Sequence, residues 1–133
     1  MFGPIKYRKG YKYQLAGDVS GQTPIKPENE IDTEFIKMTP DGFMFIKSGY
    51  AWDGATKVPD VRKAMTPSLV HDAFCQLIRN GYLPKSARKE ADIFFHTMLL
   101  ERGFWKVRAW FWLRGVRIGS KFTQKPKEVF TAP

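Results

Sequence analysis

The spacing of apolar residues changes near Pro59, and this change constrains the fold more than any other feature of the sequence. Before Pro59 the apolar residues form short runs bounded by turn-forming residues, which is typical of strands. After Pro59 they recur at three- and four-residue steps, as on one face of an amphipathic helix. A length of 133 residues fits one domain. We therefore expect a single α+β domain, residues 1–133, with 1–60 mainly strand and loop, 61–120 helical, and 121–133 an irregular basic tail.

The N-terminal half contains three runs that favour strands, Tyr11–Leu15, Ile31–Met38 and Gly42–Ala51. The last two are separated by Thr39-Pro40-Asp41-Gly42. This sequence is typical of a tight turn, because proline presets the backbone of the first central position and glycine accepts a positive φ. We therefore expect an antiparallel β-hairpin here. Segment 17–29 is rich in glycine, proline and polar residues, which predicts a long loop.

The C-terminal half predicts helices with short connections. A first helix is expected to start at Thr66-Pro67 and to end at Asn80-Gly81, and a second to run from near Ser86 to Gly103. Because residues 81–85 form a short link, the two helices should pack as an antiparallel hairpin. The residues expected to be buried in the second helix are Ala87, Ala91, Phe94 or Phe95, Met98 and Leu99.

A third helix is expected from Phe104 to about Ile118, which makes the helical part a three-helix arrangement. Its tryptophans are interleaved with one lysine and three arginines. This pattern fits a core helix with solvated cations, and it also fits a helix that lies on an anionic membrane surface. The four cations within the segment are too many for a membrane span, and no apolar signal sequence is visible at the N-terminus.

The formal net charge is +9, and most of the excess lies in the C-terminal half. Such a charge attracts nucleic acid, anionic lipid or an acidic protein without distinguishing among them. No recognisable nucleic-acid motif accompanies Lys121, Lys125 and Lys127, so nucleic acid is the weaker expectation. The single cysteine, Cys75, excludes an internal disulfide framework and a cysteine-based zinc site.

The strongest candidate for chemistry is His71, which lies on the first predicted helix beside Asp72, with Asp92 on the second. If the helices pack antiparallel, His71 and Asp92 can meet. A carboxylate would then fix the tautomer of the imidazole and leave its other nitrogen to take a proton from water. Asp72 points about a quarter-turn away and could hold a divalent cation. The alternative is a structural ion pair between two helices.

Three further features could bind metal or react. The loop around Asp53 and Gly54 could supply a carboxylate and backbone carbonyls to calcium, or it is simply a turn that ends a strand. His96 shares a helical face with Asp92 and could complete a transition-metal site, although a surface contact with Asp92 is the more common arrangement. Cys75 lies one turn after His71 and is more often a small core residue than a nucleophile.

Four segments together resemble the domain of unknown function family 1353, small proteins frequent in tailed-phage and prophage genomes. They are Tyr50–Thr56, Pro59, Leu69–Asp72 and Arg88–Phe94. This resemblance implies a phage protein that is made in the host cytoplasm and is then carried in the virion, for example in a tail or baseplate. Its partners would be other virion proteins or further copies of itself.

The His-Asp helix followed by an Ala-Asp helix is in turn similar to the catalytic hairpin of phospholipases A2. This similarity implies that His71 is the general base, that Asp92 orients it, and that Asp72 with the loop at Asp53 and Gly54 binds the calcium that polarises the ester carbonyl. Three features depart from the phospholipases A2. The disulfides of the secreted enzymes are absent, the loop at 49–56 has fewer glycines than a usual phospholipase calcium loop, and Cys75 stands where an aromatic hydroxyl is expected.

Three functions stay open from the sequence. The first is a calcium-dependent ester hydrolase that acts at an anionic phospholipid surface. The second is a structural component of the virion in which the helical hairpin is only scaffold. The third is a small phage protein that binds a host factor.

Overall fold

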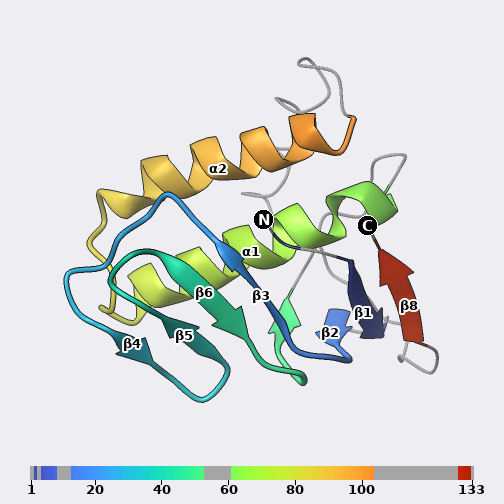
Figure 1. Ribbon diagram of the computed structural model, residues 1–133, viewed down its shortest axis with the longest axis horizontal. Helices are drawn as coiled ribbons and strands as arrows, with labels where there is room; N and C mark the ends of the chain where they lie inside the picture. The colour runs from blue at the N-terminus through green and yellow to red at the C-terminus, as the bar shows by residue number, and fades with distance from the viewer. Residues whose placement is uncertain (1, 3, 9–12, 53–60, 104–128, 133) are drawn as a thin grey trace.

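The computed structural model describes residues 2, 4–8, 13–52, 61–103 and 129–132 (Figure 1). Within them, seven strands precede a pair of helices, and one further strand follows. The expected α+β class is therefore confirmed. The strands are β1 (Ile5–Arg8), β2 (Tyr13–Leu15), β3 (Val19–Gln22), β4 (Ile31–Asp32), β5 (Ile36–Met38), β6 (Phe43–Ile46), β7 (Ala51–Trp52) and β8 (Val129–Ala132), and the helices are α1 (Val61–Arg79) and α2 (Ala87–Glu101).

The strands form two four-stranded antiparallel sheets, with strand orders β7-β2-β1-β8 and β3-β6-β5-β4. In the first sheet β8 pairs along the whole of β1, with Ile5 opposite Ala132. The second sheet contains the expected hairpin, β5 and β6, with Met38 opposite Met44. The two ends of the described chain therefore lie side by side in the first sheet (Figure 1).

The turn between β5 and β6 forms as the sequence predicts. Gly42 has a φ of 95°, which side chains rarely allow, and its amide donates a hydrogen bond to the Thr39 carbonyl at 3.0 Å. A Cβ at this position would stand 2.7 Å from the Thr23 carbonyl oxygen and 2.8 Å from that of Ile25. Glycine is therefore required here both for its backbone conformation and for the close approach of a neighbouring segment.

Two of the expected strands are broken into shorter ones. The run from Ile31 to Met38 becomes β4 and β5, because the Thr33 amide and hydroxyl both donate to the Ile36 carbonyl, at 2.9 and 2.8 Å, and close a turn between them. The run from Gly42 to Ala51 becomes β6 and β7, with a turn that includes Gly49 at a φ of 98°. β7 then joins the first sheet instead of the second.

The expected loop at 17–29 and the expected irregular tail each contain a strand, and both predictions were wrong in this respect. β3 pairs along β6 although its sequence, Val-Ser-Gly-Gln, carries little strand propensity. Its Gly21 lies under the Phe2 ring, where a Cβ would be 2.7 Å from a ring carbon. β8 in the tail pairs with β1, a strand that the sequence analysis did not predict.

The helical hairpin is confirmed, with corrected bounds. α1 starts at Val61, before the expected Thr66-Pro67, so Pro67 lies inside the helix. Proline is most common in the first turn of a helix, because inside the helix it removes one backbone hydrogen bond. Pro67 is therefore an exception, and it misplaced the predicted helix start. α2 ends before Arg102 and Gly103, close to the expected stop. The third helix expected at 104–118 lies outside the described residues. The helices of the described residues are α1 and α2.

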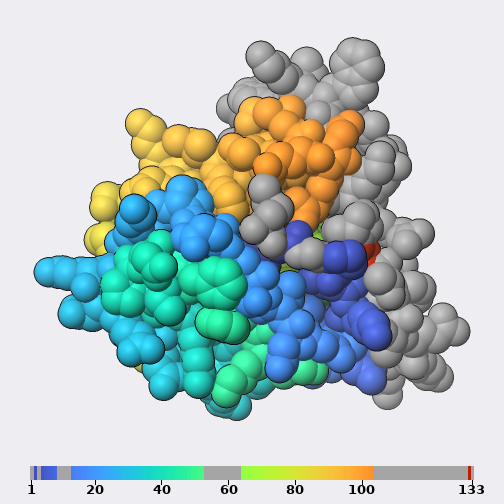
Figure 2. Space-filling model, viewed as in Figure 1, coloured from blue at the N-terminus to red at the C-terminus, as the bar shows by residue number. Residues whose placement is uncertain are grey.

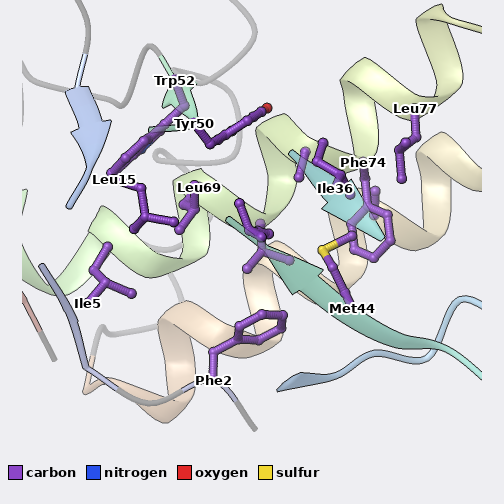
Figure 3. Close-up of a cluster of buried hydrophobic side chains, with 14 of the residues drawn as sticks. Phe2, Ile5, Leu15, Ile36, Met44, Tyr50, Trp52, Leu69, Phe74 and Leu77 are labelled. Atoms are coloured by element: carbon purple, nitrogen blue, oxygen red, sulfur yellow. The ribbon is translucent and has the colours of Figure 1, made fainter. Parts of the chain in front are cut away.

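The core lies between α1 and the strands, and α2 packs along α1 (Figure 1). On the face shown in Figure 2, the strands and α2 form the described surface and leave α1 almost hidden. The first sheet contributes Tyr7, Tyr13 and Trp52, whose rings pack with centroids 5.7 to 6.3 Å apart. Figure 3 shows side chains of α1 reaching the same buried cluster as those of the strands. Neither helix in the described part of the chain combines the length and hydropathy needed to cross a membrane.

The buried residues of α2 agree with the expectation, with Phe95 rather than Phe94 as the aromatic member. They are Ala87, Ala91, Asp92, Phe95, Met98 and Leu99. The addition to the expected set is a charged residue, Asp92.

Candidate functional site

The helical hairpin brings His71 and Asp92 together. The Nε2 atom of His71 lies 2.6 Å from Oδ1 of Asp92, and this contact links the middle of α1 to the first half of α2. His71 is 2% exposed and Asp92 is 6% exposed. The contact expected from the sequence is therefore present and shielded from water, where an electrostatic interaction is stronger than at a surface.

Arg88 approaches the same carboxylate from one turn earlier in α2. Its Nε donates to Oδ1 of Asp92 at 3.1 Å, while the Arg88 side chain remains 41% exposed. The spacing of four residues places both groups on one helical face. The same Asp92 oxygen thus accepts hydrogen bonds from the imidazole of His71 and from the guanidinium of Arg88. The positively charged Arg88 side chain extends from this buried pair to the surface.

The second ring nitrogen of His71 faces Cys75. Its Nδ1 lies 3.7 Å from the Cys75 Sγ, one turn further along α1. Because the Asp92 carboxylate accepts a hydrogen bond, the proton of a neutral imidazole lies on Nε2, and Nδ1 is then the acceptor. The Cys75 thiol can donate to it. The Phe95 ring, with its centroid 5.2 Å from that of the imidazole, packs against the histidine and restricts its orientation.

Cys75 is half-buried and carries a raised pKa. Burial is the main cause of the raised pKa, and the charges of Arg88, Asp72, Asp92 and Arg79 contribute smaller effects of both signs. The thiol therefore holds its proton at neutral pH unless a base removes it. The sequence favoured a core role for Cys75 and did not identify its contact with His71. The spacing of four residues on one helix was the available signal.

Of the expected calcium ligands, only Asp72 lies among the described residues. Asp72 is half-buried beside His71, and the part of the chain that the structure describes brings no three acidic, histidine or cysteine side chains together as a metal would require. Asp53 and Gly54 lie outside the described residues. The calcium site therefore stays a prediction, because two of its three expected ligands are not among the described residues.

His96 does not join the cluster. It is partly exposed on α2 and makes no hydrogen bond or ion pair with any described residue. Asp92 bonds to His71 and Arg88 instead. The expected contact between His96 and Asp92 was therefore wrong. His96 provides a matched control for His71, since both are histidines on the same hairpin.

The described surface also contains a hollow of about 800 Å³ between the segment before β4 and the α1–α2 turn. It is lined by Pro24, Ile31, Tyr82, Leu83 and Glu90 among others, and neither His71 nor Cys75 borders it. Within the cluster, the Arg88 side chain is 41% exposed and Cys75 is partly exposed, whereas His71 is almost completely buried.

Comparison with protein-family models, with curated proteins and with solved structures finds no match.

Proposed function

We propose that this protein hydrolyses an acyl ester, with His71 as general base and Asp92 as the residue that positions it. The observation that carries the proposal is the 2.6 Å contact between His71 Nε2 and Asp92 Oδ1, buried between the two helices. Such a contact fixes the imidazole tautomer and leaves Nδ1 as the proton acceptor.

The arrangement supports the proton transfers of ester hydrolysis. His71 Nδ1 takes a proton from the attacking group, and the Asp92 carboxylate stabilises the imidazolium that forms. The same proton is then available to the departing alcohol. Arg88 bonds to the other partner of the pair and keeps the carboxylate in place. General-base catalysis of this kind contributes on the order of 10² to 10⁴ in rate.

The proposed substrate is an ester of an anionic phospholipid. A net charge of +9 favours an anionic surface, and the His-Asp helix followed by an Ala-Asp helix is similar to the hairpin of phospholipases A2. The resemblance to the phage-associated family adds the proposal that the protein is encoded by a tailed phage and is carried in its virion. A calcium requirement stays a prediction, and the assay below tests it by comparing activity with calcium and with a chelator.

A second candidate is favoured by one observation. His71 is only 2% exposed, and its Nδ1 faces a thiol of the same helix. A buried ion pair of this kind can also serve to fix the register of two helices. Under this alternative the protein is a structural component of a phage tail or baseplate, and the pair holds the hairpin together.

The test is release of fatty acid from vesicles of anionic phospholipid by the purified full chain, with calcium and with a chelator. We expect release by the wild type and by His96→Ala. Loss on the order of 10²-fold or more is expected in His71→Gln, provided that its circular dichroism matches that of the wild type. Because His71→Gln can destabilise the hairpin, Asp92→Asn is the second variant. No release by the wild type under either condition would favour the structural alternative.

A further inference from the structure

We propose that Cys75 is the nucleophile of this site and forms a thioester with the acyl group of the substrate. The inference rests on the proposed hydrolase and names the group that attacks, which the phospholipase A2 similarity would assign to water. It follows from the spatial arrangement of three side chains, in which the Cys75 thiol contacts the His71 imidazole and the imidazole contacts the Asp92 carboxylate.

The thiol lies next to the base that must take its proton, and that base lies next to the carboxylate that orients it. The Cys75 Sγ lies 3.7 Å from His71 Nδ1, and His71 Nε2 lies 2.6 Å from Asp92 Oδ1. The thiol and the carboxylate thus occupy opposite nitrogens of one imidazole. A nucleophile within reach of a base, with the base held by a third group, is the pattern of nucleophilic catalysis.

The position of Cys75 also gives it access that the base lacks. His71 is almost completely buried, whereas Cys75 is only partly buried. A substrate that reaches this cluster therefore meets the sulfur before it meets the imidazole. A water activated by Nδ1 would have to occupy the space that the sulfur already borders.

The first half of the reaction forms the thioester. His71 Nδ1 takes the proton of the Cys75 thiol as the sulfur attacks the acyl carbon, and the carbonyl electrons move to its oxygen. When the tetrahedral intermediate collapses, the bond to the alkoxide breaks, and the alkoxide takes the proton from His71. The products of this half are a free alcohol and Cys75 joined to the acyl group.

The second half restores the enzyme. His71 Nδ1 takes a proton from a water molecule, and the oxygen of that water attacks the thioester carbon. The bond between the carbon and the sulfur then breaks, and the sulfur regains its proton from the imidazole. The sum of both halves is one ester and one water converted to one acid and one alcohol, with no oxidant or further reactant.

Arg88 supplies positive charge beside the reacting sulfur. Its Nε is bonded to Asp92, and its other guanidinium nitrogens make no hydrogen bond with the described residues. The charge of Arg88 acts on the Cys75 thiol. Since Cys75 lies within a helix whose amides bond to their own carbonyls, we assign the stabilisation of the oxyanion to this guanidinium.

The experiment treats the full chain with p-nitrophenyl acetate, stops the reaction with acid, and measures the intact mass. Because Cys75 is the only cysteine, an acetyl group on it can be located by peptide mapping. We expect a burst of nitrophenol equal to the protein concentration and one acetyl group on Cys75. Cys75→Ala should lose both, and His71→Gln should form the adduct on the order of 10²-fold more slowly, whereas His96→Ala should behave as the wild type.

Phospholipid hydrolysis by the same variants separates this inference from the function on which it rests. If Cys75→Ala keeps hydrolysing vesicles while His71→Gln does not, water is the nucleophile, and only the inference is overturned. If Cys75 is acetylated equally fast in His71→Gln, the thiol is merely accessible, and the inference is overturned as well. If Cys75→Ala, folded by circular dichroism, loses both vesicle hydrolysis and the adduct, the inference holds.

Discussion

The two sides of α1 bury polar groups in different ways. Toward the strands, the indole Nε1 of Trp52 donates to the Ser68 hydroxyl at 3.1 Å, and that hydroxyl donates to the Met65 carbonyl at 2.9 Å. Toward α2, the buried contact is the pair of titratable groups, His71 and Asp92. One side therefore buries neutral hydrogen bonds, and the other buries a histidine with a carboxylate.

This difference separates stability from function. Neutral hydrogen bonds with a full set of partners are compatible with an apolar core at little cost. A buried ion pair costs more in lost hydration, and apolar residues of similar size often stabilise a protein as well or better. The strand side of α1 has the kind of polar contact expected of an apolar core. The α2 side contains a buried titratable pair, and our proposal places the chemistry there.

The largest expected effect tests the apolar core against which α1 packs. Phe74 is fully buried in the cluster of Figure 3, and Phe74→Ala removes a ring that the surrounding side chains cannot replace. We expect a loss of about 3 to 5 kcal/mol in the free energy of unfolding, measured by urea denaturation. Phe94→Ala is the control, because Phe94 is only partly buried and should lose less. Equal losses would show that the cluster is not the main core.

The next effect tests the α2 side directly. Asp92→Ala leaves His71 buried without its carboxylate, and we expect a loss of about 3 kcal/mol in unfolding free energy. The double variant His71→Leu with Asp92→Leu removes both polar groups, so its stability should lie within about 1 kcal/mol of the wild type, with no hydrolysis. A double variant as unstable as Asp92→Ala would mean that the pair is structural, and the contrast between the two sides of α1 would disappear.

A smaller effect is expected from the neutral hydrogen bond. Ser68→Ala leaves the Trp52 indole donor buried without its acceptor, which should cost about 1 to 3 kcal/mol in unfolding free energy. Chemical denaturation followed by tryptophan fluorescence measures it. Hydrolysis by this variant should equal that of the wild type while it remains folded. A loss of hydrolysis by folded Ser68→Ala would connect the two sides of α1.

The smallest effect, absent at neutral pH, concerns Tyr13. Burial, with a smaller contribution from Tyr7, raises the pKa of Tyr13 to about 12 from an ordinary 10.0. The folded state therefore holds this proton more tightly than the unfolded state, so stability is unaffected below pH 10 and falls as the pH rises from about 10 to about 12. Ultraviolet titration of tyrosinate, compared between wild type and Tyr13→Phe, measures the shift. A normal pKa for Tyr13 would contradict its burial.

Local sequence signals predicted much of the fold. The hairpin of β5 and β6 follows from Thr39-Pro40-Asp41-Gly42, and α2 follows from the spacing of its apolar residues and its stop at Gly103. The errors have a common cause. β3 and β8 were not predicted because their pairing depends on β6 and β1, which lie far away in the sequence.

The candidate site was predicted only in part. An antiparallel hairpin with a short link indicated that His71 and Asp92 can meet, and the structure shows the contact. The contact of Cys75 with His71 was not identified, because a spacing of four residues shows that two side chains share a face and not that their reacting atoms meet. The predicted contact of His96 with Asp92 was wrong for the same reason, because it also rested on a spacing of four residues. Asp92 had several candidate partners within reach, and the spacing did not decide among them.

The sequence by itself determined the α+β class and the helical hairpin, because these depend on periodicity and on one short connection, and it indicated that His71 and Asp92 can meet. Only the tertiary structure decided which nitrogen of His71 faces Asp92, that Arg88 shares that carboxylate, and that Cys75 stands at the opposite nitrogen. These features depend on the packing of α1 against α2, which sets distances to within an ångström. No local pattern in the chain encodes that packing.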